Sequence, residues 1–228
     1  MIKTLLWDVD GTLLDFLAAE KYGMRKCLAE IGVEMTDEML ARYSAINHSW
    51  WAKLERGEAT RRDVFVERLR EFFALYGITY DDYDRFNTRY QEALGEAVFP
   101  MDDCIALLKK LFPLYRMYFV TNGSKRAQEL KLAKSGLDKL VHGIFISEEV
   151  GYQKPLKAFF DVVKAKTGYV DEETLIIGDS LSSDMQGGNN AHIRCCWYNP
   201  NGAQPKDGVK VDYEIRNLWE LCEILGLE

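Results

Sequence analysis

Short apolar runs alternate with helical patterns along most of the chain after residue 116. One helix is predicted from Ser124 through Ala133, ending near Gly136, and another is predicted after Pro155. Strands are predicted at residues 2–7, 117–120, 143–146, 174–177 and 194–198, with an edge strand at 211–215. Because this alternation requires crossover connections, we expect an α/β fold: a Rossmann-like, mostly parallel sheet with helices on both faces.

Residues 16–99 follow a different pattern, in which strand-like runs are absent and apolar residues recur at helical spacing. Glycines separate these helices at Gly32, Gly57 and Gly77. Thr60 and Asp63 have the spacing of a capping box, which marks the start of a helix. We therefore predict an α/β core domain of residues 1–15 and 100–228, and a helical domain of residues 16–99 inserted into it.

Composition narrows the class of partner. With 228 residues, 47% of them hydrophobic, the chain can bury a full core. Its net charge of -7 disfavours a nucleic-acid polymer or an anionic membrane as partner, whereas a local cation can still attract a small anionic substrate. We expect no membrane span, because no apolar stretch is long enough, and no signal peptide, because Asp8 and Asp10 interrupt the apolar N-terminus.

Cysteine and histidine usage adds two expectations. The chain has five cysteines, an odd number, and Cys195 and Cys196 are adjacent in a predicted strand. Neither observation fits a disulfide framework, so we expect reduced thiols and a cytoplasmic protein. The three histidines lie far apart in the sequence, without other ligands at zinc spacing, so a zinc site is not expected.

Two carboxylates follow the first predicted strand. Asp8 and Asp10 stand directly after the apolar run of residues 2–7, where the chain is expected to be buried. Burying a carboxylate is costly unless it is paired or bound to a cation, and two neighbouring carboxylates also repel each other. The pair therefore predicts a metal site or a chemical task.

Further polar groups stand at the ends of the other predicted strands, namely Thr121, Asn122, Lys154, Asp179 and Asp184. In a doubly wound sheet these strand ends meet in one crevice, where ligands bind. Each residue alone has an ordinary explanation as part of a turn, a solvated charge or a helix cap. Their shared position at strand ends favours a functional site.

Four motifs occur in a fixed order: D-V-D-G-T, V-T-N-G, K-P and G-D-S-x-x-x-D. They resemble the motifs of the haloacid dehalogenase (HAD) superfamily, whose first type of cap domain is inserted where this chain has its helical domain. The stretches I-S-E-E-V-G and Y-S-A-I-N further resemble the bacterial house-cleaning pyrimidine 5′-nucleotidases. The resemblance implies a phosphatase acting on a small phosphorylated metabolite, a pyrimidine or non-standard nucleoside 5′-monophosphate.

The resemblance also gives the acidic residues their roles. Asp8 would attack phosphorus and form an aspartyl-phosphate. Asp10 would protonate the leaving oxygen and then activate the hydrolytic water. Mg²⁺ would be held by Asp8, Asp179 and the Asp10 carbonyl oxygen, with Asp184 as a further ligand or acting through a water molecule.

Donors for the phosphoryl group are implied as well. They are the Thr121 hydroxyl, the Asn122 backbone amide and the Lys154 ammonium, which would surround the oxygens of the transferred group. Phe16, Trp50 and Trp51 are candidates for contact with a nucleotide base, although aromatic residues at helical spacing more often belong to a core.

Alternative activities remain open at this point. Dehalogenases of the superfamily lack an aspartate at the position of Asp10, and phosphonatases need a cap lysine, for which Lys21, Lys26 and Lys53 are candidates. A sugar-phosphate phosphatase or a phosphoglucomutase-like enzyme would share the same core motifs. A non-catalytic phosphate-binding protein would be expected to lack a motif residue, and all are present. Both a monomer and a homodimer are compatible with the sequence.

Overall fold

A computed structural model describes residues 1–227 of the chain. Its centre is one parallel sheet with the strand order β3-β2-β1-β4-β5-β6. The strands are β1 (Thr4–Trp7), β2 (Arg116–Thr121), β3 (Gly143–Ile146), β4 (Thr174–Gly178), β5 (Arg194–Tyr198) and β6 (Tyr213–Ile215). Every predicted strand is present to within two residues at each end, and the predicted α/β fold is confirmed.

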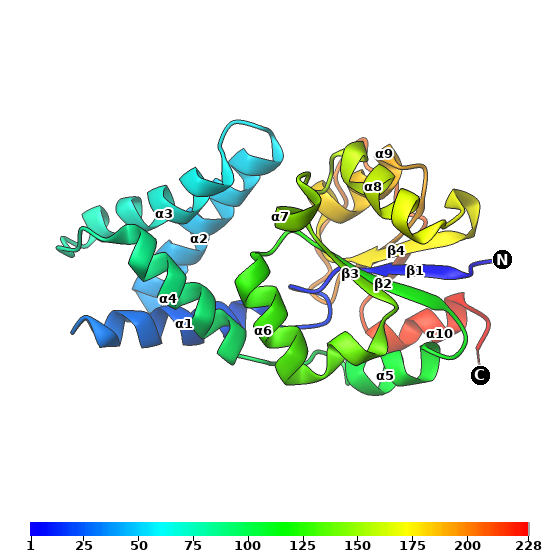
Figure 1. Ribbon diagram of the computed structural model, residues 1–228, viewed down its shortest axis with the longest axis horizontal. Helices are drawn as coiled ribbons and strands as arrows, with labels where there is room; N and C mark the ends of the chain where they lie inside the picture. The colour runs from blue at the N-terminus through cyan, green and yellow to red at the C-terminus, as the bar shows by residue number, and fades with distance from the viewer. Residues whose placement is uncertain (228) are drawn as a thin grey trace.

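Helices cover both faces of the sheet (Figure 1). They are α5 (Cys104–Leu111) and α10 (Leu221–Ile224) on one face, and α8 (Lys157–Thr167) and α9 (Gln186–Asn190) on the other. Side chains of β1 alternate between the two layers, as expected for a buried strand. Leu5 and Trp7 pack in the apolar cluster that contains α5, whereas Leu6 packs in the cluster that contains α8.

Four helices form a separate lobe between β1 and α5 (Figure 1). They are α1 (Phe16–Glu30), α2 (Asp37–Glu55), α3 (Arg61–Leu75) and α4 (Tyr83–Glu96). The predicted capping box is confirmed, because the side chains of Thr60 and Asp63 each accept a hydrogen bond from the other's backbone N–H. The lobe has its own apolar cluster, which includes Tyr43, Phe72 and Phe73.

Helix α6 (Lys125–Ser135) lies between the lobe and the sheet (Figure 1). It packs along α4, and its Ala127 is part of the lobe's apolar cluster. The remaining short elements are α7 (Ser147–Val150), a π-helical turn (Leu181–Met185) and 3₁₀ turns at Leu137–Leu140, Asp171–Glu173 and Leu218–Glu220. None of the helices in residues 1–227 combines the length and apolar character needed to cross a bilayer.

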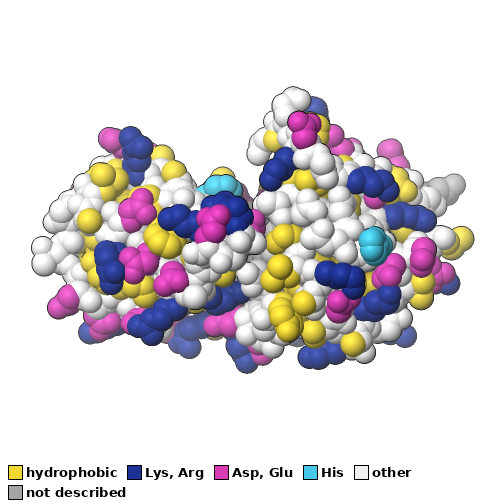
Figure 2. Space-filling model, turned by 90° about the horizontal axis from the view of Figure 1, so that it is seen from above, with side chains coloured by type: hydrophobic (Ala, Val, Ile, Leu, Met, Phe, Trp, Pro, Cys, Tyr) yellow, Lys and Arg dark blue, Asp and Glu magenta, His cyan; other side chains and the backbone are white. Residues whose placement is uncertain are grey.

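The two connections between lobe and sheet run side by side. The backbone N–H of Asp15 donates to the Phe99 carbonyl at 2.9 Å, and that of Met101 donates to the Leu13 carbonyl at 3.0 Å. The strands run from the N-terminus toward the lobe, so their carboxyl ends face it (Figure 1). Seen from above, the surface is hollowed between the two lobes, and charged side chains border the hollow (Figure 2).

Candidate active site

The predicted site residues lie where the strand order reverses. Strand β1 lies between β2 and β4, and the chain leaves it in opposite directions across the sheet. This is the position at which doubly wound sheets bind ligands. It brings together Asp8 after β1, Thr121 at the end of β2 and Asp179 after β4.

Lys154 is the central cation of the site. Its side chain is 1% exposed, and Nζ donates to Asp8 Oδ1 at 2.7 Å, to Asp184 Oδ1 at 2.6 Å and to the Val120 carbonyl at 2.6 Å. These three bonds use all of the donors of an ammonium group. Burial opposes the charged form, but the Asp184 and Asp8 carboxylates raise the pKa of Lys154 above its ordinary value. Lys154 therefore remains a cation inside the site.

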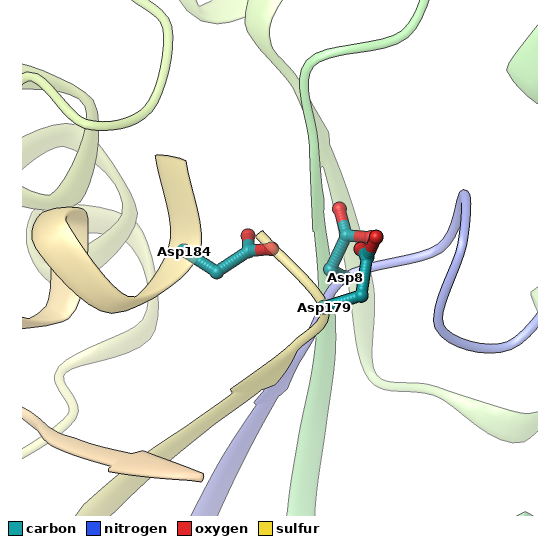
Figure 3. A group of neighbouring side chains, drawn as sticks. All are labelled: Asp8, Asp179 and Asp184. Atoms are coloured by element: carbon teal, nitrogen blue, oxygen red, sulfur yellow. The ribbon is translucent and has the colours of Figure 1, made fainter. Parts of the chain in front are cut away.

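Three carboxylates gather around this lysine. Asp8, Asp179 and Asp184 each offer an oxygen, and these oxygens lie within 4.8 Å of one another. Figure 3 shows Asp8 and Asp179 side by side, with Asp184 approaching from the neighbouring turn. Burial raises the pKa of Asp8 to about 7, because Lys154 only partly offsets it and Asp184 adds a like charge.

Asp179 differs from Asp8 in its exposure. Its side chain opens to solvent, yet the protein atoms around it and the charges of Asp8 and Asp184 raise its pKa well above the usual range. Three carboxylates against the single ammonium of Lys154 leave two negative charges in the ionised cluster. A cluster with that excess and only oxygen donors fits a divalent hard cation such as Mg²⁺.

Asp184 has less freedom to bind a cation directly. Its Oδ1 accepts from Lys154, and its Oδ2 accepts from the Ser180 backbone N–H at 3.1 Å. Its carboxylate also lies so close to Gly178 that any Cβ there would overlap it. Asp8 and Asp179 are therefore the side chains best placed to hold the metal, whereas Asp184 orients Lys154.

Gly11 and Thr12 shape the loop that follows β1. Gly11 has a φ of +87°, and a Cβ at this position would lie 2.6 Å from Asp179 Oδ2. The fully buried Thr12 hydroxyl lies 3.2 Å from Asp8 Oδ2 and 3.3 Å from Asp179 Oδ1, and it accepts from the Asp179 backbone N–H at 3.1 Å. Sequence reasoning gave Thr12 no role, although it is the last residue of the D-V-D-G-T motif.

The loop after β2 presents the predicted phosphate donors. Thr121 is buried, and its hydroxyl oxygen accepts from the Gly123 N–H at 3.2 Å, which leaves the hydroxyl hydrogen available to a ligand. Asn122 uses its side chain differently. Its Nδ2 donates to the Lys154 carbonyl and its Oδ1 accepts from the Lys154 N–H, both at 2.9 Å. The Asn122 side chain therefore fixes the backbone of the segment that carries Lys154.

Asp10 is held by helix α6. Gln128 Nε2 donates to Asp10 Oδ2 at 2.6 Å, and the Lys131 ammonium forms an ion pair with Asp10 Oδ1. Neither Gln128 nor Lys131 was singled out from the sequence. A glutamine and a lysine on a predicted helix are normally solvent-exposed, so the pattern gave no signal for them.

The helical lobe reaches the site through the start of α3. Arg61 donates from Nη1 to the Asn122 carbonyl at 3.1 Å and from Nη2 to the Ser147 hydroxyl at 2.6 Å. Its guanidinium lies 5.7 Å from the centre of the Trp51 ring. Through Arg61, the lobe thereby brings Trp51 toward the loop that follows β2.

The end of α2 makes a second set of contacts with the core. Glu55 accepts a hydrogen bond from the Ser182 hydroxyl at 2.8 Å, and the Leu54 carbonyl accepts one from Gln153 Nε2 at 3.1 Å. Ser182 lies in the π-helical turn that also carries Asp184. Burial raises the pKa of Glu55, although the Ser182 hydroxyl opposes this shift. The lobe thus contacts two loops of the site.

The other two aromatic candidates make contacts within the lobe. Trp50 donates from Nε1 to Glu71 at 3.0 Å, and Lys53 Nζ lies 3.6 Å from its ring centre. Phe16 is half-buried and packs against the lobe's apolar cluster. Of the three predicted base contacts, Trp51 is the one that the described contacts connect to the core.

Comparisons with known proteins agree with these motifs. The profile of the haloacid dehalogenase-like hydrolases matches residues 2–192. The HAD-hydrolase YfnB of Bacillus subtilis is 37% identical, over 99% of this chain and 96% of YfnB. The pyrimidine 5′-nucleotidase PynA of Streptococcus pneumoniae is 34% identical, over 98% of this chain and 94% of PynA. The pyrimidine 5′-nucleotidase YjjG of Escherichia coli is 27% identical, over 97% of this chain and 96% of YjjG.

A solved structure agrees with the fold throughout. The crystal structure of orthorhombic YfnB from Bacillus subtilis, which is bound to magnesium and reveals interdomain movement, matches this chain with a TM-score of 0.94. The match has 36% sequence identity and covers 99% of each chain. These similarities confirm the predicted superfamily and an enzyme of the phosphatase type. The chain belongs to the haloacid dehalogenase-like hydrolases.

Proposed function

We propose that this enzyme is a magnesium-dependent phosphomonoester hydrolase that forms an aspartyl-phosphate on Asp8. The observation that carries the proposal is the unbalanced acidic cluster around a fully engaged Lys154. An excess of buried negative charge is costly in a purely structural site, and a cation together with a phosphoryl group removes that cost.

Asp8 is the proposed nucleophile. Lys154 holds its Oδ1, and the Thr12 hydroxyl lies near its Oδ2, so the carboxylate has a fixed orientation at the end of β1. In the first half of the reaction a carboxylate oxygen of Asp8 attacks phosphorus, and the bond from phosphorus to the ester oxygen breaks. Asp10 gives a proton to that leaving oxygen.

The second half of the reaction returns the enzyme to its starting state. A water molecule attacks the phosphorus of the aspartyl-phosphate, and Asp10 accepts a proton from that water. The Thr121 hydroxyl and the Asn122 backbone N–H are the proposed donors to the phosphoryl oxygens. Lys154 would join them by exchanging its bond to Asp8 Oδ1 for one to a phosphoryl oxygen.

Asp8, Asp179 and the Asp10 carbonyl oxygen are the proposed ligands of Mg²⁺. Asp184 would lie beside them and orient Lys154. When bound there, the metal offsets the negative charge of the cluster and of the incoming phosphate. The magnesium-bound structure of the similar YfnB supports this choice of cation.

We also propose that residues 16–99 act as a cap domain over residues 1–15 and 100–228. The chain crosses between the two lobes at the paired connections near Asp15 and Phe99, while α6 packs along α4 beside them. Arg61 and Glu55 contact the core from the opposite end of the lobe. The interdomain movement in YfnB supports a cap that opens for substrate and closes to exclude bulk water.

The proposed substrate is a nucleoside 5′-monophosphate, with pyrimidine or non-standard bases preferred. The names of PynA and YjjG support this substrate class, and Trp51 beside Arg61 offers an aromatic face near the phosphate-binding loop. Base stacking on such a face tolerates different bases. Five unpaired cysteines, all of them buried, also support the predicted cytoplasmic location.

A substrate panel tests the proposed function. Phosphate release is measured with Mg²⁺ for pyrimidine and purine nucleoside 5′-monophosphates, hexose phosphates and phosphoglycolate. We expect kcat/KM for a pyrimidine nucleoside monophosphate to exceed that for every sugar phosphate by about tenfold or more. A sugar phosphate with the highest kcat/KM would replace the nucleotide proposal by the sugar-phosphate phosphatase alternative. Absence of hydrolysis for the whole panel would refute phosphatase activity.

A pair of tryptophan variants tests the base contact. Trp51→Ala should raise KM for a nucleoside monophosphate about tenfold, because a stacking surface is lost, and should leave p-nitrophenyl phosphate hydrolysis nearly unchanged. Trp50→Ala is the matched control, since the Trp50 indole bonds Glu71 within the lobe. Equal effects of the two substitutions on the nucleotide would contradict a specific role for Trp51.

A further inference from the structure

Helix α6 carries two buried polar side chains that end on Asp10. Lys131 is 3% exposed and Gln128 is 0% exposed, and both point away from solvent toward the loop after β1. Gln128 Nε2 donates to Asp10 Oδ2 at 2.6 Å, while Lys131 pairs with Asp10 Oδ1. Each carboxylate oxygen of Asp10 therefore has its own donor from the same helix.

Burial of Lys131 is informative because an ammonium group is costly to remove from water. Within residues 1–227, the only ion-pair or hydrogen-bond partner of its side chain is Asp10. By contrast, Lys134 on the same helix is exposed and donates to the Glu96 carbonyl at 2.7 Å. Lys131 thus makes a single, specific contact with a residue of the site.

Gln128 is fixed just as closely. Its amide lies directly against Gly123, where a Cβ would overlap it, so the phosphate-binding loop closes over the side chain. Its Oε1 has no hydrogen-bond partner among the described residues. Burying an amide oxygen without a hydrogen-bond partner costs free energy. We therefore infer that the bond from Gln128 Nε2 to Asp10 is the reason for a glutamine at this position.

We propose that Lys131 and Gln128 are positioning residues, which hold the Asp10 carboxylate ready to accept a proton from the water that hydrolyses the aspartyl-phosphate. The inference rests on the proposed function. It adds that these two residues act in the second half of the reaction, the hydrolysis of the aspartyl-phosphate. Both contacts are donated to Asp10, so they suit a carboxylate that accepts a proton.

The chemistry of that half-reaction balances without another reactant. The water oxygen forms a bond to phosphorus, and the bond between phosphorus and the Asp8 carboxylate oxygen breaks. The electron pair of the broken bond returns to Asp8, the water proton passes to Asp10, and inorganic phosphate leaves. If Asp10 is wrongly oriented, this half-reaction slows, and the aspartyl-phosphate accumulates on Asp8.

An aryl phosphate separates the two halves of the reaction. The phenolate of p-nitrophenyl phosphate leaves without a proton donor, so formation of the aspartyl-phosphate with this substrate does not depend on Asp10. For a two-step reaction of this kind, kcat/KM reports steps up to release of the leaving group, whereas kcat also includes hydrolysis of the intermediate.

The test uses Lys131→Met in the full-length enzyme with p-nitrophenyl phosphate and Mg²⁺. We expect kcat and KM to fall together by about 10- to 100-fold, part of the usual contribution of a general base, with kcat/KM within about threefold of the wild-type value. Rapid mixing should show a burst of about one nitrophenolate per active site, because the intermediate accumulates.

Gln128→Met should give the same pattern with a smaller fall in kcat, and it decides the question if Lys131→Met does not fold. Lys131→Arg keeps the cation and should recover most of kcat. Lys134→Met is the matched control, expected to match wild type in kcat and KM. Thermal unfolding of each variant checks that its fold is intact.

Two outcomes would overturn the inference. One is a fall in kcat/KM as large as the fall in kcat, without a burst, which would indicate general damage to the site. The other is wild-type kinetics in both Lys131→Met and Gln128→Met. If instead the wild-type enzyme hydrolyses no phosphomonoester, the proposed function itself has failed, which the substrate panel shows before any variant is made.

Discussion

The helical lobe and the α/β core both bury charged side chains, but they balance these charges differently. In the lobe, Glu20 accepts from the Ser44 hydroxyl and from Asn47 Nδ2, and Arg68 donates to Asn47 Oδ1 and to Asn87 Oδ1, both at 2.7 Å. The Glu20 carboxylate and the Arg68 guanidinium are thus joined through the Asn47 amide. The lobe network carries no net charge.

The network of the lobe ends at the core. Gln91 Nε2 donates to Asn87 Oδ1 at 3.2 Å, and Gln91 Oε1 accepts from the Ser124 hydroxyl at 2.6 Å. Ser124 also caps the start of α6 by accepting from the Ala127 N–H. These contacts explain the burial of Glu20, Asn47, Asn87 and Gln91 as a structural feature of the lobe.

The core cluster cannot be explained in the same way. Its three carboxylates face one ammonium, and the pKa of Asp8 and that of Asp179 are both raised. The comparison teaches that burial of polar groups does not by itself mark a functional site. An excess of one charge, which a bound cation can balance, is the feature that distinguishes the core cluster from the lobe network.

The largest expected difference between the two regions is in catalysis. Asp8→Asn keeps the shape of the side chain but removes the attacking charge, so turnover should fall by about 10⁴-fold or more. The metal-free melting temperature should hold or rise, because the substitution lowers the charge excess of the cluster. Near-normal phosphate release by this variant, measured with purified protein and Mg²⁺, would rule out a covalent intermediate on Asp8.

The next largest effect concerns stability in the lobe. Arg68→Met should lower the free energy of unfolding by about 3 kcal/mol, because it leaves Asn47 Oδ1 without its donor, Asn87 Oδ1 with one of its two donors and Glu20 without a nearby cation. Urea unfolding measures this value. Removing the charge of Arg68 would then destabilise the lobe, whereas removing the charge of Asp8 would not destabilise the core. A change below about 0.5 kcal/mol for Arg68→Met would contradict this difference between the two regions.

The smallest effect is a pH dependence that comes from Glu20. Burial raises the pKa of Glu20 above that of the unfolded chain, although the Ser44 and Asn47 donors oppose the shift. A raised carboxyl pKa favours the folded state at low pH, and this contribution is lost as pH rises through the folded-state pKa.

Glu20→Gln removes this titration and keeps both hydrogen-bond partners within reach. From pH 4.5 to pH 8, wild-type stability should therefore fall relative to that of the variant. Paired urea unfolding curves at the two pH values give the difference, in which the other titrating groups cancel. An increase in the relative stability of the wild type with pH would contradict the assigned burial of the Glu20 charge.

The sequence predicted those parts of the molecule that follow from a pattern of neighbouring residues. Buried parallel strands are short apolar runs, and a carboxylate placed directly after such a run stands out, as Asp8 and Asp179 do. Thr121 was found for the same reason, whereas Lys154 was found as part of the K-P motif between a predicted strand and the next helix. Strand order was not predicted, because pairing depends on contacts between segments far apart in the chain.

Residues whose burial depends on another segment were missed. Helix α6 buries Ala127, Gln128, Lys131 and Leu132, so its inward face is half polar and hydrophobic periodicity does not identify it. Arg61 contacts Asn122 only because the lobe folds back over the core. These residues surround the motifs, and only the fold places them there.

Magnesium binding tests the central claim most directly, since the claim is that a divalent cation balances the core cluster. Mg²⁺ is titrated by calorimetry into protein freed of metal by chelation, for the wild type, Asp179→Ala and Glu20→Gln. The account predicts one Mg²⁺ per chain for the wild type and for Glu20→Gln, and an affinity at least about tenfold weaker for Asp179→Ala. Undetectable binding to the wild type, or binding to Asp179→Ala as tight as to the wild type, would contradict it.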